Sequence, residues 1–347
     1  MSLNLPPTPP TQYRAFKPQP LVSAAEQLWA QLISIPVQLH QLTRFSCSVS
    51  STPDVWQLLD SAETHDVQGR FYWHDRQQKM EVVGLGIADD VRSSTQSGFA
   101  DYWQQMKTTT AGTDALYFGG LSFNGRDGTD HWQGFDALRF ALPVVELRRT
   151  GEQWQLSVQL FAQSTEQWHT QFNVARQILY RMLVAYIVPS EQSLPPVTNR
   201  QSLTSQEQWQ QQVTDALQHI KTHRLDKVVL ARATAFEFDR KTPLATLAQR
   251  WQSQTPGTFG FALNFGGASF VGFSPERLLR QHGVDIATEA LAGTQPRGEN
   301  ELQDHDFEQI LRNDRKLIHE HKLVADFIAD QLKPYSRHTL SDAQVSI

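Results

Sequence analysis

Strand-like segments joined by tight turns constrain the fold of this chain more than any other feature of its sequence. The segments "LRFALPVVELRR" (138–149) and "QWQLSVQLFA" (153–162) are joined through Thr150-Gly151, which suits a hairpin turn. A second hairpin is expected from Phe259 to Phe273, turning at Gly266-Gly267. Strands with such short connections run antiparallel, because a parallel pair needs a long crossover. The sequence therefore predicts antiparallel sheets.

Helical periodicity alternates with these strands. Amphipathic helices are expected over 21–35, 167–187 and 205–220, and a long helix over about 302–332. Strands clustered in each half of the chain, with helices between them, are typical of an α+β protein. We therefore expect large antiparallel β-sheets with helices packed outside.

Proline and serine content divides the chain into four parts. Residues 1–20 form a Pro-rich, polar tail, and residues 21–187 the first structured part. Residues 188–204, within "VPSEQSLPPVTNRQSLTS", lack an apolar period and are interpreted as a surface linker. Residues 205–347 form the second structured part, to which the motifs below belong.

Composition and charge exclude several classes of function. The formal net charge is −5 and lysines and arginines form no basic cluster, so nucleic acid is not expected as a partner. No window approaches the roughly 18 apolar residues of a membrane span, and the Pro-rich, polar N-terminal segment is not expected to act as a signal sequence. With Cys47 as the single cysteine, the default expectation is a cytoplasmic protein without an intrachain disulfide. The oligomeric state stays open.

Lys227 stands at the start of "KVVLAR" (227–232), a run that is predicted to be a strand buried on both faces. Lysine is rarely buried, so this position needs an explanation. Either the strand emerges into water at Lys227, or the amine takes part in a site. The local pattern leaves both interpretations open.

Glu320 interrupts the apolar stripe of the long C-terminal helix. Ile310, Leu317, Val324 and Phe327 follow helical spacing, and Glu320 fills the gap between two of them. The periodicity therefore predicts a carboxylate that faces the core. Such a group must be neutralised, form a salt bridge or hold a metal ion.

Four motifs in order resemble those of the chorismate-utilising enzymes, the family of the anthranilate, aminodeoxychorismate, salicylate and isochorismate synthases. They are "KVVLAR", "GFSPERLLR", "EALAGTQPRG" and "HEHKLV", all within residues 205–347. The earlier part resembles the family more loosely, through "YFGGLSF" and "FALPVVELRR". The resemblance implies the chorismate-binding fold, with chorismate as the small-molecule substrate.

Two positions indicate the type of reaction within that family. Members that add ammonia carry glutamine at the position of Lys227, whereas members that add water carry lysine. Aminodeoxychorismate enzymes place a nucleophilic lysine where this chain has Ala292. The resemblance therefore implies an isochorismate synthase, most like those of the menaquinone pathway. A salicylate synthase-type relative is the alternative.

The resemblance also implies a role for each motif. Lys227 would activate the attacking water, and Glu276 in "SPER" would protonate the departing hydroxyl, although Ser-Pro-Glu is also a common turn composition. Glu320 would be a ligand of Mg²⁺. The substrate carboxylate would lie against the loop formed by Ala292, Gly293 and Thr294.

The C-terminal end departs from the family pattern. Family members continue beyond the position of Ile347, and "QVSI" (344–347) reads as the start of a strand. We therefore expect the C-terminal part of the fold to be missing from this sequence, including a second carboxylate for magnesium. A truncated, non-catalytic fragment of the family is accordingly a further hypothesis.

Overall fold

The computed structural model describes residues 20–123, 132, 134–184 and 193–339. It divides into two compact units. Unit 1 comprises Met1–Pro195 and Arg240–Pro275, and unit 2 comprises Pro196–Asp239 and Glu276–Ile347. The Pro-rich tail through residue 19 and the expected strand at 344–347 lie outside the described residues.

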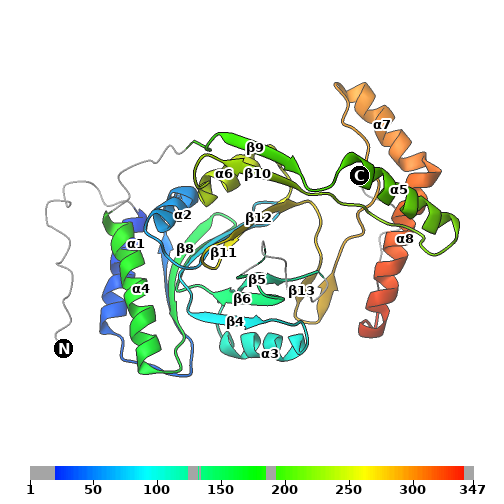
Figure 1. Ribbon diagram of the computed structural model, residues 1–347. Coiled ribbons are helices and arrows are strands. Elements are labelled where there is room, and N and C mark those ends of the chain that lie inside the picture. Colours follow the sequence, from blue (N-terminus) through cyan, green and yellow to red (C-terminus); the bar gives the residue numbers. More distant parts are fainter. Residues whose placement is uncertain (1–19, 124–131, 133, 185–192, 340–347) are drawn as a thin grey trace. The chain divides into compact units, whose positions relative to one another are not determined.

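A seven-stranded antiparallel sheet is the centre of unit 1 (Figure 1). Every neighbouring pair in it is antiparallel, and Thr150 pairs with Gln153 across the predicted turn. The predicted antiparallel sheet and both hairpins are confirmed. In spatial order the strands are β1 (Thr43–Val49), β8 (Gln153–Leu160), β7 (Val145–Thr150), β3 (Met80–Leu85), β2 (Arg70–His74), β11 (Phe259–Asn264) and β12 (Ser269–Ser274).

A smaller sheet of unit 1 has the order β4 (Asp89–Ser93), β6 (Leu138–Leu142) and β5 (Phe118–Leu121). The segment 138–149 therefore contributes to both sheets, since β6 ends before Pro143 and β7 begins after it. Proline has no N–H for a strand ladder, and it interrupts the run at this point.

Helices cover the large sheet of unit 1. Helix α1 (Pro20–Ser34) packs against α4 (Thr165–Val184), and α2 (Val55–Thr64) packs against α6 (Leu244–Gln254). Helix α3 (Phe99–Thr109) follows β4. The structure thus has the α+β class with a large antiparallel sheet that the sequence predicts.

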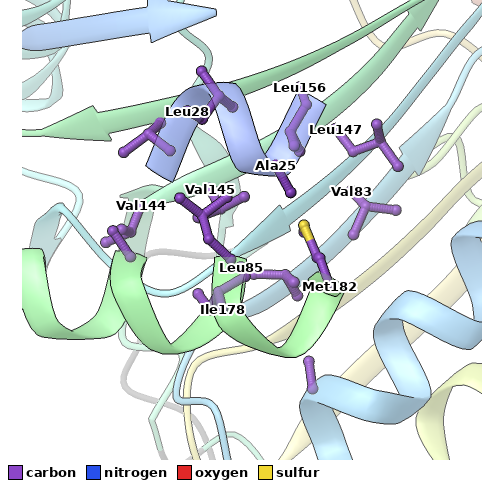
Figure 2. Close-up of a cluster of buried hydrophobic side chains, with 14 of the residues drawn as sticks. Ala25, Leu28, Val83, Leu85, Val144, Val145, Leu147, Leu156, Ile178 and Met182 are labelled. Carbon is purple, nitrogen blue, oxygen red and sulfur yellow. The ribbon is translucent and has the colours of Figure 1, made fainter. Parts of the chain in front are cut away.

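The main core lies between α1, α4 and the sheet (Figure 2). Side chains from both helices meet those of three central strands, and this removal of apolar surface from water stabilises unit 1. Cys47 belongs to the same core and is a free thiol. The cluster includes Ala25, Leu28, Val83, Leu85, Val145, Leu147, Leu156, Ile178 and Met182.

Unit 2 is built from helices and two-stranded ribbons. Strand β9 (Val197–Ser202) pairs with β10 (Thr234–Phe238), and β13 (Arg280–His282) pairs with β14 (Asp285–Ala287). Its helices are α5 (Gln206–Lys221), α7 (Glu301–Asn313) and α8 (Arg315–Leu332), followed by the 3₁₀ turn η3 (Lys333–Tyr335). None of the residues described in unit 2 is fully buried.

Strand β9 falls within the expected linker. Its residues are all exposed, so the sequence carries no apolar period that would reveal a strand. Residues 188–192 of that linker lie outside the described part of the chain. The domain boundaries derived from composition stay a prediction.

The long C-terminal helix is divided in two by Asp314. Its carboxylate accepts hydrogen bonds from the N–H groups of Lys316 and Leu317, and its own N–H donates to the carbonyl of Ile310. Asp314 therefore ends α7 and caps α8 at the same position. The expectation of one continuous helix over 302–332 is wrong, because a favourable N-cap competes with continuation of the helix.

Among the helices that the structure describes, none combines the length and the apolar character that a membrane span requires.

Candidate functional site

Unit 2 carries every residue that the motifs predict for a site. These residues come from the segment before β10, the segment after β12, the loop after β14, and α8. The contacts within unit 2 show which of these segments lie together.

Lys227 lies in the connection between α5 and β10 and is half-buried. Residues 227–232 form no strand, and Val228 and Val229 are 39% and 81% exposed. The prediction of a strand buried on both faces is therefore wrong for this structure. An apolar run predicts burial, but a strand also needs a neighbour, and the described residues provide none here. Among the described residues, Lys227 forms no hydrogen bond or ion pair with the segments that carry Glu276, the loop 292–294 or Glu320.

The segment that carries Glu276 runs beside the residues that follow β14. The Nη1 atom of Arg277 lies 3.4 Å from Oε1 of Glu289, and the hydroxyl of Thr288 donates to the carbonyl of Leu278 at 2.8 Å. These contacts continue the β13–β14 ribbon toward its open end. Glu276 itself is exposed, so the structure does not provide the partial burial that we expected for a proton donor.

The loop after β14 packs against the junction of α7 and α8. Nε2 of His321 lies 3.2 Å from the carbonyl oxygen of Ala290. Gly293 has φ +89°, and a Cβ atom at this position would lie 3.4 Å from Cδ1 of Leu311. Glycine is suited to both the positive φ and the close approach. Ala292 and Gly293 are half-buried, and Thr294 is exposed.

The loop continues into an ion pair with α7. Arg297 pairs with Asp304, and the N–H of Gly298 donates to the same carboxylate at 2.5 Å. The hydrogen bonds from Arg297 and Gly298 lower the pKa of Asp304 to about 2. A shallow pocket beside this pair contains none of the predicted site residues, and its lining is Pro296, Arg297, Glu299, Gln303, Asp306 and Phe307.

Glu320 lies on α8, next to the histidine that contacts the loop. Its side chain is 34% exposed, and Nζ of Lys316 lies 3.9 Å from Oε1. The prediction that this carboxylate faces a core is wrong for this structure, because α8 has no buried residue. Helical periodicity identifies a face of a helix but not what covers that face. Among the described residues, no group of three or more His, Cys, Asp or Glu side chains forms a metal site.

The structure thus connects three of the four predicted segments. Residues 277–278 contact 288–289, Ala290 contacts α8, and Gly293 lies against both C-terminal helices. Sequence reasoning missed Arg277, Glu289 and His321 as the residues that make these connections. All three lie inside the motifs, but motif spacing does not reveal which side chains pair.

Comparisons with known proteins agree with the motifs. The family described as "Chorismate binding enzyme" matches residues 31–347. The chain is 26% identical to the isochorismate synthase MenF of Bacillus subtilis over 277 residues, which is 75% of this chain and 58% of that relative. It is 29% identical to MenF of Pasteurella multocida over 322 residues, or 91% of this chain and 67% of the relative.

A solved structure of the menaquinone-specific isochorismate synthase MenF from Escherichia coli is also similar. The TM-score is 0.75 at 25% identity, and the match covers 91% of this chain and 69% of that one. The chain therefore spans only part of the length of these relatives. The match confirms the fold class and the resemblance inferred from the four motifs.

Proposed function

We propose, because this chain belongs to the chorismate binding enzyme family, that it acts as an isochorismate synthase and converts chorismate to isochorismate. The observation that carries the proposal is Lys227 within "KVVLAR". The water-adding members that the motifs resemble have lysine at this position. Similarity to two isochorismate synthases over three quarters or more of the chain supports the same choice.

The proposed reaction moves a hydroxyl group from C4 to C2 of the substrate ring. The amine of Lys227 accepts a proton as water attacks C2, and the ring double bonds shift as the C4–O bond breaks. Glu276 donates a proton to the departing oxygen, which leaves as water. One water molecule is consumed and one is released, so the reaction is an isomerisation.

The loop of Ala292, Gly293 and Thr294 is the proposed site for the substrate carboxylate. Gly293 has no side chain between its backbone and a ligand, and its positive φ allows consecutive N–H groups to turn toward an anion. The contact between Ala290 and His321 holds the start of this loop against α8. The loop therefore combines a defined position with an accessible backbone.

Magnesium is proposed as the cofactor, with Glu320 as one ligand. Mg²⁺ keeps several waters and commonly binds through one or two carboxylates together with oxygens of the substrate. A half-exposed carboxylate on the helix that contacts the substrate loop fits such partial coordination. When bound, the ion would offset the negative charge of the substrate carboxylate.

The similarity to MenF enzymes favours the menaquinone pathway over siderophore supply, and a cytoplasmic location is expected with it. Salicylate formation is the second candidate. The motifs favour it less than isochorismate formation, because "ATEALAGT" (287–294) is more like the menaquinone-pathway enzymes.

Product identification tests the proposal. The purified chain is incubated with chorismate and Mg²⁺, and the products are separated and identified by mass and ultraviolet spectrum. Isochorismate is the expected product. Salicylate with pyruvate would support the second candidate, and the absence of turnover would support a non-catalytic fragment of the family.

A further inference from the structure

Arg76 contacts the peptide group that leads into Glu276. Nη1 of Arg76 donates a hydrogen bond to the carbonyl oxygen of Pro275 at 2.9 Å, although the two are 199 positions apart in the sequence. Arg76 belongs to the turn between β2 and β3, outside all four motifs. We propose that Arg76 is a positioning residue for Glu276, an inference that rests on the proposed function.

The geometry of the peptide group explains how one hydrogen bond can act on the next residue. The carbonyl of Pro275 and the nitrogen of Glu276 lie in one rigid plane. The pyrrolidine ring fixes φ of Pro275, so ψ of Pro275 is the main remaining freedom of this plane. A donor that holds the carbonyl oxygen restricts that rotation. It therefore restricts the orientation of the peptide plane that contains the backbone nitrogen of Glu276.

Arg76 itself is held in place by its turn. The carboxylate of Asp75 accepts hydrogen bonds from the N–H groups of Lys79 and Met80 at 2.6 and 3.0 Å. The backbone N–H of Asp75 also donates to the carbonyl of Met80 at 3.0 Å. These bonds close the turn on both sides of Arg76. The guanidinium donor therefore starts from a fixed backbone.

The guanidinium also lies across the end of the hairpin that precedes Glu276. Its central carbon is 5.5 Å from the ring centroid of Phe259, and Phe259 pairs with Ser274 at the last register position of β11–β12. Two contacts thus locate Arg76 at this end, one to a ring and one to a carbonyl. A lysine could donate to the carbonyl but could not reproduce the planar contact with the ring.

A double-mutant cycle separates positioning from a general structural role. Arg76→Met and Arg76→Lys are each made in the wild type and in the Glu276→Gln background. Arg92→Met, an exposed arginine on β4, is the matched control. For every variant, kcat and KM for chorismate are measured together with the thermal unfolding midpoint.

We expect Arg76→Met to lower kcat by about 10- to 100-fold, since small misplacements of a catalytic group have effects of this size. KM should change less than about twofold, and Arg76→Lys should recover part of the loss. In the Glu276→Gln background the same substitution should have no further effect, because the group that it positions is already absent. An equal loss in both backgrounds would overturn the proposal.

Hydrogen exchange provides a second test that does not need turnover. Exchange of amides in residues 276–279 should be several-fold faster in Arg76→Met than in Arg92→Met, at unchanged unfolding midpoint. Unchanged exchange in this segment would overturn the inference even if the enzyme is active. If the wild type makes no isochorismate but exchange responds as expected, the proposed function fails while the contact keeps its effect on the segment.

Discussion

The guanidinium of Arg277 lies 3.4 Å from the carboxylate of Glu289, and this ion pair joins the segment of Glu276 to the loop of Gly293. Both side chains are 26% exposed. The pair connects the proposed proton donor with the proposed substrate loop through two adjoining backbone segments. Its contribution should therefore be larger for activity than for stability.

Replacing Glu289 with glutamine tests this difference. A partly exposed ion pair contributes about 0 to 1 kcal/mol, so the free energy of unfolding should fall by no more than about that amount. Turnover should fall by about tenfold or more, because both segments lose a defined position. The control is Glu308→Gln, which removes another ion pair of unit 2, with Arg312 on α7. Similar activity losses in both variants would contradict a specific role for Glu289.

Lys227→Ala should abolish conversion of chorismate while leaving its binding largely intact. The amine is proposed to activate water and not to hold the substrate carboxylates, so removing it affects the reaction more than affinity. Turnover is followed by product formation, and binding by calorimetry. Lys221→Ala, at the end of α5, provides a control for loss of one positive charge. Near wild-type turnover in Lys227→Ala would contradict a catalytic role for the amine and would leave Lys227 as a surface residue in contact with solvent.

Titration with magnesium tests the role of Glu320. Removal of divalent ions with a chelator should abolish turnover, and Mg²⁺ should restore it in the wild type. Glu320→Ala should lose turnover together with the response to Mg²⁺. Asp326→Ala, which removes a carboxylate paired with Lys322 on the same helix, should keep that response. An unchanged half-saturating Mg²⁺ concentration in Glu320→Ala would contradict the proposal that Glu320 is a ligand of Mg²⁺.

Asp114 should make unit 1 more sensitive to acid. Partial burial alone would raise the pKa of Asp114, but the guanidinium groups of Arg44 and Arg148 outweigh it and hold that pKa below its usual value. The carboxylate therefore contributes stability above about pH 4, the ordinary pKa of aspartate, and loses it as the pH falls through the lowered folded-state pKa.

Unfolding midpoints measured between pH 2 and 7 check this sign. Asp114→Asn should lower stability at pH 7 by about 1 kcal/mol or less, since the side chain is 61% exposed, and the difference from wild type should vanish at low pH. Asp330→Asn, on the exposed part of α8, is the control. A difference that stays constant across this pH range would contradict the ionic role.

Features set by local chemistry could be predicted from the sequence. The turn at Gly266-Gly267 lies where expected, and both glycines have positive φ. The helix expected from residue 205 begins there, with Ser205 as its N-cap, and the hydroxyl of Ser205 accepts a hydrogen bond from the N–H of Gln208. Such features depend on a few neighbouring residues, so a single sequence contains the information that they need.

Features that depend on distant partners could not be predicted in the same way. The pairing of β11 with β2 joins segments about 190 residues apart, and nothing in either strand specifies the other. The same applies to the proposed site, for which the motifs predict Glu276 and Gly293 but not the contact of Arg76 with Pro275. At Val229 the sequence predicts a contact that the structure lacks. Its apolar neighbours predict a buried strand, but Val229 is exposed and no described segment covers it.

Isotope incorporation from water tests the central claim, addition of water at C2, most directly. The reaction is run in H₂¹⁸O with chorismate and Mg²⁺, and the mass of the isolated isochorismate is measured at low conversion. The account predicts one ¹⁸O atom in each isochorismate molecule formed, located in the hydroxyl group at C2. Isochorismate without the label would show that the original hydroxyl migrates, and it would contradict the roles proposed for Lys227 and Glu276.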